Sequence, residues 1–338
     1  MKKIAILGAG GFGIAIAATC DMIGHDVSVW SLFEKEVQAL ETNRCNNKLL
    51  PGVMLSDRVN VTGDLSVVDT ADVVIIAVPS FAVRSTAALA APHIKADTVV
   101  VNVAKGLEVD ENGNFYRLSE VISQEIDSQN IVVMTGPTHA EEIAKGVPST
   151  ITAASLNPAA AAAVQELFLN SHLRVYYNND IVGAEVGGAL KNCIALAAGI
   201  IDGMGLGDNT KAALMTRGLA EMARLGVAMG GRQDTFAGLS GVGDLIVTCT
   251  SVHSRNHRAG ELIGKGMTAQ EAIEAVGMTV EGYSAVKTAY FISHKLGVEM
   301  PIIEQMYLTL YENKPSKEAL GDLMVRPQKH EMERPWNA

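Results

Sequence analysis

A single lysine, Lys191, lies in an apolar helical run whose neighbours on the same side are nearly all tiny. At helical spacing its face is shared by Ala184, Gly187, Gly188, Ala195 and Ala198. Glycine costs about 1 kcal/mol relative to alanine inside a helix, so helix propensity does not explain this composition. Either another helix packs closely here while Lys191 extends its amine to water, or the face brings a ligand to a functional amine. The remaining motifs must decide between these two interpretations.

A glycine-rich turn, Gly8-Ala-Gly10-Gly11-Phe12-Gly13, follows an expected strand at residues 3–7 and opens an expected helix at residues 14–23. In such a turn the first glycine permits the bend, the second lets a pyrophosphate approach, and the third lets helix and strand pack closely. The helix N-terminus supplies amide donors and the positive end of its dipole. Strand, glycine turn and helix in this order predict dinucleotide binding, with a plain turn as the alternative.

The end of the second expected strand, residues 27–30, bears on the choice of cofactor. A carboxylate there binds the adenosine ribose of NAD, whereas an arginine favours NADP. The strand continues as Ser31-Leu32-Phe33-Glu34, in which neither determinant stands at the usual position. With no arginine present, and with Glu34 able to repel a phosphate, we expect a preference for NAD(H). NADP(H) remains the alternative, because Lys35 could reach a 2′-phosphate.

Polar residues follow three further expected strands. Ser80 follows residues 73–78, Lys105 follows residues 99–103, and Gly136-Pro-Thr138-His139-Ala140 follows residues 131–134. Because ligands of open α/β sheets bind at the carboxyl ends of strands, we expect these residues to line one crevice. An exposed loop lysine is the alternative for Lys105. His139 has no evident carboxylate partner in the sequence, which favours a structural or helix-start role over that of a base.

The second half of the chain contains Gly241-Val-Gly-Asp244 and a basic run around Ser254-Arg255-Asn256. An arginine among hydroxyl and amide donors suits a phosphate, since its guanidinium makes bidentate charge-assisted hydrogen bonds. A solvated basic loop is one alternative, and a metal site on His253 and His257 is another. The histidines lack a glutamate beside the first of them and a cysteine pair, so we expect no metal.

Composition limits the class of protein. The chain has 338 residues, 48% of them hydrophobic, and a net charge of -10. This length predicts about two domains, and the acidic balance argues against a nucleic-acid or membrane-surface protein. The four cysteines show neither metal nor disulfide spacing, and the N-terminus leaves no room for a signal peptide. We therefore expect a cytoplasmic protein that is not inserted in a membrane.

The order of apolar segments predicts the fold. Short β-branched runs alternate with helical patterns through the first half, which is typical of a doubly wound, mainly parallel sheet. Two further strands, at residues 149–154 and 173–177, flank a helix that begins at Pro158. From Asp180 the period is helical almost to the end. We predict an α/β dinucleotide-binding Rossmann domain at residues 1–179 and an all-helical substrate and catalytic domain at residues 180–338.

These motifs together resemble NAD(P)-dependent sn-glycerol-3-phosphate dehydrogenases over nearly the whole chain, to about Met324. The longest matching signature runs from Gly188-Ala-Leu-Lys191-Asn192 through Gly203-Met-Gly-Leu-Gly-Asp-Asn209. Two positions depart from the family pattern. Cys193 replaces an aliphatic residue, and Thr138 replaces the commoner serine but keeps a hydroxyl.

The resemblance implies a Rossmann domain, an all-α C-terminal domain of the 6-phosphogluconate-dehydrogenase-like type, and reversible reduction of dihydroxyacetone phosphate for glycerophospholipid synthesis. Lys191 would be the acid/base of the reaction. The expected binding partner would be a small molecule, dihydroxyacetone phosphate, and not another macromolecule. The substrate contacts implied are Lys105, Gly136, Thr138, Lys191, Asp244, Ser254, Arg255 and Asn256. The cofactor contacts, with the fingerprint glycines, are Gly8, Gly10, Gly11, Phe12, Gly13, Lys105, Ala140, Arg255 and Glu281. The oligomeric state stays open, with a homodimer as one alternative.

Two other functions remain to be weighed. A hydroxy-acid dehydrogenase with the same two-domain plan would recognise a carboxylate, and the cluster at Ser254-Arg255-Asn256 only partly excludes it. A non-enzymatic NADH-sensing regulator would not need Lys191 on a small-residue face. It should also carry a DNA-binding or partner module, which the sequence does not show.

Overall fold

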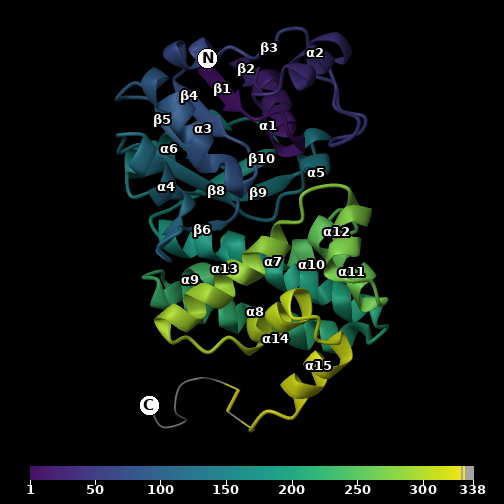
Figure 1. Cartoon of the computed structure of the whole chain (residues 1–338). Coiled ribbons are helices and arrows are strands. Elements are labelled where there is room, and N and C mark those ends of the chain that lie inside the picture. Colours follow the sequence, from purple (N-terminus) through teal and green to yellow (C-terminus); the bar gives the residue numbers. More distant parts are fainter. Residues whose placement is uncertain (329, 332–338) are drawn as a thin grey trace.

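The computed structural model describes residues 1–328 and 330–331, so residues 329 and 332–338 of the predicted second domain lie outside the described residues. Figure 1 shows two stacked parts: a sheet flanked by helices in the N-terminal half, and a helical assembly in the C-terminal half. The sheet order is β10-β9-β8-β5-β4-β1-β2-β3. All neighbours are parallel except β8 and β9. The mainly parallel, doubly wound sheet predicted from the sequence is confirmed.

The strands of this sheet are β1 (Lys3–Leu7), β2 (Asp26–Trp30), β3 (Asn60–Thr62), β4 (Val73–Ile76), β5 (Val99–Asn102), β8 (Ile131–Thr135), β9 (Ser149–Ala154) and β10 (Leu173–Asn178). The helices connecting them are α1 (Gly11–Met22), α2 (Glu34–Asn43), α3 (Val83–Ala90), α4 (Leu118–Glu125), α5 (Ala140–Ala144) and α6 (Pro158–Leu167). Short 3₁₀ turns are η1 (Leu65–Thr70), η2 (Ser80–Ala82) and η3 (Ala91–His93).

Both faces of the sheet are buried, which explains its continuous apolar strands. On β1, Ile4 and Ile6 belong to the core beneath α1, α5 and α6, whereas Ala5 and Leu7 belong to the core beneath α3 and α4. Because side chains alternate along a strand, β1 contributes residues to the cores on both faces of the sheet.

Several predicted boundaries differ from the structure. The strands predicted at residues 73–78 and 99–103 end at Ile76 and Asn102, so the loops that lead to Ser80 and Lys105 begin two residues and one residue earlier. The helix predicted from residue 14 begins at Gly11, because the glycine turn supplies its first residues: Ile14 N donates to Gly10 O at 3.0 Å. The short strand β3 was not predicted.

A two-stranded hairpin, β6 (Leu107–Val109) and β7 (Phe115–Arg117), was also missed. Its strands are too short to show a period. The apolar side chains Leu107, Val109 and Phe115 pack against the core of the C-terminal helices, although they belong to the N-terminal half of the chain. The hairpin therefore joins the two halves directly after Lys105.

The C-terminal half consists of α7 (Ile181–Gly203), α8 (Gly207–Ala228), α9 (Gln233–Phe236), the π-helical turn η4 (Leu239–Gly243), α10 (Asp244–Thr250), α11 (Arg255–Gly264), α12 (Ala269–Val276), α13 (Glu281–Leu296), α14 (Pro301–Tyr311) and α15 (Ser316–Met324). The central α7 is long and apolar enough to cross a membrane, but its whole apolar window is buried inside this protein. Helix α11 crosses it closely. A Cβ at Gly199 would lie 2.0 Å from His257 O, and one at Gly260 would lie 2.0 Å from Leu196 O.

Candidate active site

Two lysines and one aspartate meet between the two halves of the molecule. Lys191 Nζ lies 2.9 Å from Asp244 Oδ1, and Lys105 Nζ lies 2.6 Å from Asp244 Oδ2. The side chains of Asp244 and Lys191 are 1% and 8% exposed, so water screens this ion pair little. Lys105 also donates to Gly136 O at 3.0 Å. The structure thus joins four of the residues singled out in the sequence, and Lys105 is not an exposed loop lysine.

Each member comes from a different element. Lys191 is on α7, Asp244 begins α10 directly after η4, and Lys105 lies between β5 and the hairpin. The turn η4 rests on α7: a Cβ at Gly187 would lie 2.4 Å from Ser240 O. Residue 187 must therefore be a glycine for the η4 backbone to come this close to α7. Because Asp244 directly follows η4, this contact also determines where Asp244 lies along α7.

The charges perturb one another. Burial alone would raise the pKa of Asp244, but the two ammonium groups outweigh burial and hold it below its usual value. Burial lowers the pKa of Lys105 to about 8, with Lys191 adding to the fall and Asp244 opposing it. Two cations share one carboxylate, which leaves an excess positive charge suited to an anionic or charge-developing ligand.

Sequence reasoning missed Thr248. Lys191 Nζ donates to Thr248 Oγ1 at 2.6 Å, and that hydroxyl donates to Asp244 O at 2.6 Å. Thr248 is 3% exposed. The signal available was its position four residues after Asp244, which places both on one face of a helix.

The small residues beside Lys191 make room for protein atoms. Gly187 accommodates η4, and a Cβ at Gly188 would lie 3.4 Å from Thr135 Cγ2 and 3.6 Å from Lys105 Cγ. Close packing therefore accounts for these two glycines. The functional interpretation of the lysine is nevertheless favoured, because Lys191 is held in an ion pair and does not reach out to water.

The glycine turn has the three roles expected of a phosphate-binding turn. Gly8 has a φ of +126°, and a Cβ there would lie 2.5 Å from Ala77 O. A Cβ at Gly13 would lie 2.2 Å from Gly8 O, so helix and turn pack without room for a side chain. By contrast, a Cβ at Gly10 would meet only Ala77 O, at 3.9 Å. The open middle position fits a pyrophosphate.

The other residues implied to contact cofactor lie at this turn or across the domain boundary. A Cβ at Gly11 would lie 3.9 Å from the Ala140 Cβ, and Phe12 packs partly against the sheet core. Glu281, at the start of α13, accepts from Ser80 Oγ at 2.6 Å and from Ser80 N at 3.2 Å. This pair ties the end of β4 to the helical half.

The expected phosphate cluster lies on a helix and not in a solvated loop. Ser254 caps α11, its Oγ accepting from His257 N at 3.2 Å. Arg255 is the exposed first residue of α11. Asn256 is buried: its amide donates to Asn192 Oδ1 at 2.9 Å and accepts from Gly282 N at 2.8 Å. Asn256 thereby joins α11, α7 and α13 and fixes the first turn that carries Arg255.

Three histidines near the site have separate partners. His139 precedes α5, with Nε2 lying 3.4 Å from Val247 O, and burial together with the charge of Lys191 lowers its pKa. His257 Nε2 lies 2.8 Å from Asp202 Oδ2, whereas the His253 ring lies 5.9 Å from that of His139. Among the described residues no group of three or more potential ligands could hold a metal ion.

The end of β2 differs from the sequence interpretation. Ser31 is buried, and its Oγ donates to Glu36 Oε2 at 2.6 Å. A carboxylate therefore does reach the residue after β2, but it comes from Glu36 in the first turn of α2 and not from Glu34. Phe33 is 62% exposed. The sequence interpretation considered residues 31–34 and overlooked Glu36, which the start of α2 brings back to the strand end.

Comparison with known protein families agrees with this architecture. Residues 3–161 match the model of the NAD-dependent glycerol-3-phosphate dehydrogenase N-terminus, and residues 180–321 match that of the NAD-dependent glycerol-3-phosphate dehydrogenase C-terminus. The first match ends within α6 and the second begins one residue before α7, so residues 162–179 lie between them.

Individual relatives agree. A glycerol-3-phosphate dehydrogenase [NAD(P)+] of Desulfitobacterium hafniense is 48% identical over 98% of this chain and 94% of its own length. One of Enterococcus faecalis is 49% identical over 98% of both. The crystal structure of glycerol-3-phosphate dehydrogenase from Coxiella burnetii superposes with a TM-score of 0.91 at 35% identity, covering 96% of this chain and 99% of that one. The chain therefore belongs to the NAD-dependent glycerol-3-phosphate dehydrogenase family.

Proposed function

We propose that this protein catalyses the reversible NAD(P)H-dependent reduction of dihydroxyacetone phosphate to sn-glycerol 3-phosphate, the substrate of glycerophospholipid synthesis. The observation that carries the proposal is the buried cluster of Lys191, Asp244 and Lys105 between a dinucleotide-type turn and a helical domain. Family membership supports an oxidoreductase over a sensing regulator.

The residues present fit a dinucleotide. Gly8, Gly10 and Gly13 provide the bend, the open approach and the tight helix packing that a pyrophosphate requires. We assign four further residues to contact the dinucleotide: Gly11, Phe12, Ala140 and Glu281. When bound, the reduced nicotinamide supplies the hydride that the ketone carbon accepts.

We assign to Lys191 the role of donating the proton that the substrate oxygen gains. Reduction of a ketone builds negative charge on its oxygen, which a nearby ammonium can stabilise and then protonate. Asp244 and Thr248 hold the amine from two sides, at 2.9 and 2.6 Å, so its direction is set before substrate arrives. Lys105 adds a second cation beside the reacting group.

Arg255 is assigned to the substrate phosphate. Its guanidinium is exposed at the first turn of α11, where peptide N–H groups and the helix dipole also favour an anion. In a chain of net charge -10, such a local concentration of donors is needed to hold a phosphate. Ser254, Asn256, Gly136 and Thr138 complete the proposed substrate contacts. Binding energy from the phosphate would position the ketone against Lys191.

The test of substrate class is the fall in NADH absorbance with dihydroxyacetone phosphate, compared with a panel of 2-keto and 3-keto acids. We expect turnover with the phosphate ester only. Faster turnover of a keto acid would favour the hydroxy-acid dehydrogenase. In Arg255→Ala we expect a strongly raised KM for dihydroxyacetone phosphate and little change for unphosphorylated dihydroxyacetone. Equal losses for both ketones would refute the phosphate assignment.

We also propose that NADH is preferred over NADPH. Ser31 Oγ, directly after β2, donates to the Glu36 carboxylate, and we assign this carboxylate to accept from the ribose 2′-hydroxyl and to repel a 2′-phosphate. The measurement is kcat/KM for both cofactors in the wild type, Ser31→Arg, and Glu36→Gln, which keeps the acceptor but removes the charge. Both variants should shift the ratio toward NADPH. A wild-type value for NADPH equal to that for NADH would contradict the preference.

A further inference from the structure

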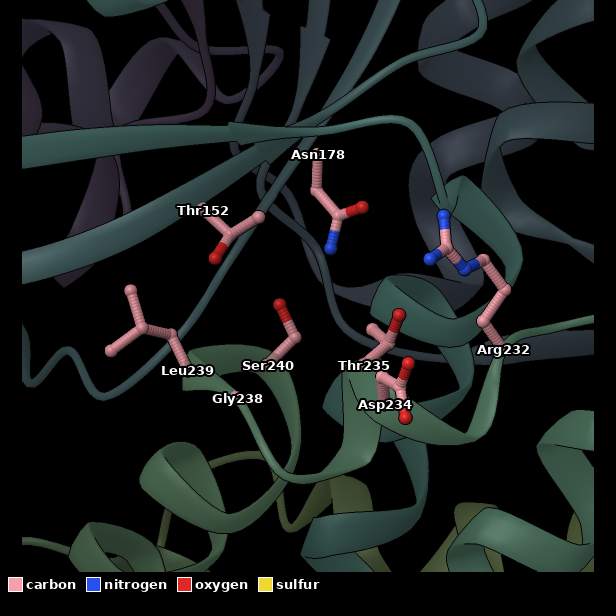
Figure 2. A pocket seen from close by; sticks show the side chains of 8 residues that line it. All are labelled: Thr152, Asn178, Arg232, Asp234, Thr235, Gly238, Leu239 and Ser240. Carbon is pink, nitrogen blue, oxygen red and sulfur yellow. The ribbon is translucent and has the colours of Figure 1, made fainter.

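An open cavity of about 170 Å³ lies between strands β9 and β10 of the sheet and the segment from α9 to η4 of the helical half. Figure 2 shows it bordered by Thr152 of β9 and Asn178 of β10 on one side, and by the segment from Arg232 to Ser240 on the other. A water molecule in the liquid takes about 30 Å³, so the cavity has room for a phosphate ion or a small carboxylate. It shares no lining residue with the proposed substrate or cofactor contacts.

Polar groups facing the cavity lack partners. Thr152 is 6% exposed, and its hydroxyl has no hydrogen-bond partner among the described residues. The Asn178 carbonyl accepts from Asp180 N at 2.9 Å, but its NH₂ group has no partner in the described part of the chain. In Figure 2 this NH₂ points toward the Ser240 hydroxyl across the open space. Neither group is a desolvated orphan, because Arg44 Nε is the one fully buried side-chain atom without a partner in the described part of the chain. Both groups therefore face the open space and are available to hydrogen-bond a ligand there.

The balance of groups favours an anion. The free NH₂ group of Asn178 can only donate, and the hydroxyls of Thr152 and Ser240 can also donate. The Arg232 guanidinium, at the mouth, donates to Asn179 Oδ1 at 3.3 Å. The nearby Asp180 carboxylate is already satisfied by the N–H groups of Gly183 and Arg232 and by Thr235 Oγ1. Asp234 opposes an anion, but it is exposed at the rim.

The cavity also adjoins the turn that carries the catalytic carboxylate. Ser240 belongs to η4, which ends at Gly243 immediately before Asp244. Thr135 Oγ1, on the strand that leads into Gly136, donates to Ser240 Oγ at 2.6 Å. Since Ser240 O also packs on Gly187, a ligand that shifts η4 would change how Asp244 meets Lys191. π-Helical turns are frequent at functional sites.

We propose that this cavity is a second site, distinct from the active site, that binds a small oxyanion, a phosphate or a carboxylate, between the two domains. Its occupant bridges donors from the sheet and from the helical half, and through η4 it modulates turnover. A ligand that contacts both halves stabilises their present arrangement by RT ln(1 + [L]/Kd), so the stabilisation grows with ligand concentration.

The test measures anion binding by calorimetric titration of the full chain, with inorganic phosphate in one arm and acetate in the other. Arg255→Ala serves as the background, because it removes the phosphate contact proposed for the substrate. We expect this background to keep one saturable site. If Arg255 is not the substrate anchor, this background will keep two phosphate sites, and only the cavity site will respond to the cavity variants. A failure of the Arg255 assignment can therefore be told apart from a failure of the cavity proposal.

Three cavity variants test whether the ligand of the cavity is negatively charged. Asn178→Asp keeps the oxygen that accepts from Asp180 N but replaces the free NH₂ by a negative oxygen, so the anion Kd should rise about tenfold or more. Thr152→Val, which keeps the side-chain shape, should also raise it. Asp234→Asn should lower it. Asn170→Asp, an exposed position with the same change in charge, is the matched control and should leave it unchanged.

Two results would overturn the site: no saturable binding of either anion, or equal titrations for Asn178→Asp and Asn170→Asp. The link to turnover is tested by kcat at saturating substrates with and without inorganic phosphate, where competition at the active site is overcome. We expect phosphate to change kcat in the wild type but not in Asn178→Asp. Binding without any change of kcat would refute the coupling to Asp244 and leave the binding site established.

Discussion

Asp244 accepts from two ammonium groups, and this sharing determines how the site responds to pH. Its carboxylate is fully buried and stays ionised because Lys105 and Lys191 outweigh the cost of burial. Burial lowers the pKa of Lys105 to about 8. A modest rise in pH therefore removes one cation from the site.

We predict that kcat/KM for dihydroxyacetone phosphate falls as pH rises through about 8. The sign follows from the lowered pKa: Lys105 is charged below this value and neutral above it, and the neutral amine no longer attracts the anionic substrate. In Lys105→Arg, this fall should move to higher pH, because a guanidinium stays protonated. The check is a pH profile of kcat/KM for both proteins. The same descending limb in the variant would contradict the assignment to Lys105.

Among single residues, the sequence predicted which lysines belong to the candidate site better than it predicted their contacts. Lys191 was recognisable by its small neighbours, and Lys105 by its position after a buried strand. Thr248 and Glu36 were missed because their contacts depend on where a helix begins. Thr248 reaches Lys191 only because α10 starts at Asp244, and Glu36 reaches Ser31 only because α2 starts at Glu34.

At the scale of elements, α7 holds the two halves together as well as carrying Lys191. Glu185 on α7 accepts from Ser119 N at 2.8 Å, Ser119 Oγ at 2.5 Å and Arg117 Nη1 at 3.1 Å. These donors lie at the start of α4, next to the hairpin that packs into the helical core. Burial raises the pKa of Glu185, and the charge of Arg117 opposes the rise.

We predict that Glu185→Ala lowers the free energy of unfolding by about 3–5 kcal/mol, because it leaves a buried peptide N–H and a buried hydroxyl without their acceptor and removes the buried one of the two carboxylates that pair with Arg117. Glu120→Ala is the matched control. Glu120 also pairs with Arg117, at 2.6 Å, but is 43% exposed, so its loss should cost about 1 kcal/mol. Urea unfolding of both variants gives the comparison. Equal costs would show that Glu185 does not hold the domains.

Elements with a clear period were predictable, and short ones were not. The buried strands β4, β5 and β8 carry continuous runs rich in valine and isoleucine. The hairpin strands β6 and β7 and the strand β3 have three residues each, too few to show alternation. Their existence is decided by what they pack against, which only the folded chain shows.

Across the whole molecule, one buried carboxylate joins distant parts of the helical half. Glu221 on α8 is 2% exposed and accepts from Ile302 N at 2.8 Å and Ile303 N at 3.3 Å, at the start of α14. Burial raises its pKa to about 7, although the two N–H donors favour the charged form. The folded protein thus keeps a proton that the unfolded chain releases above its ordinary pKa of 4.5.

We predict that the stability contributed by this proton is fully present below about pH 4.5 and is lost as pH rises through about 7. The loss amounts to about 3 kcal/mol at 1.36 kcal/mol per pKa unit. Glu221→Gln should lack this loss, so it should gain on the wild type between pH 5 and pH 8. Urea unfolding at both pH values measures the difference. Glu304→Gln, on the exposed side of α14, is the control, and a parallel response of wild type and Glu221→Gln would refute the prediction.

The fold class and the family were predictable at this scale, because a buried parallel sheet, a glycine fingerprint and a long helical second half leave distinct sequence patterns. The way the halves interlock was not. The hairpin at residues 107–117 and the ties from Glu185 and Glu281 cross from one half to the other, so no local period encodes them.

The central claim is that the Lys191 amine gives its proton to the substrate oxygen and does not hold the dinucleotide. Its most direct test is Lys191→Met, assayed for kcat with dihydroxyacetone phosphate and, separately, for NADH affinity by fluorescence titration. We predict a fall in kcat of about 10²-fold or more, the usual size of general-acid effects, with the NADH Kd nearly unchanged. A variant that binds NADH normally and keeps more than about a tenth of wild-type turnover would contradict the claim.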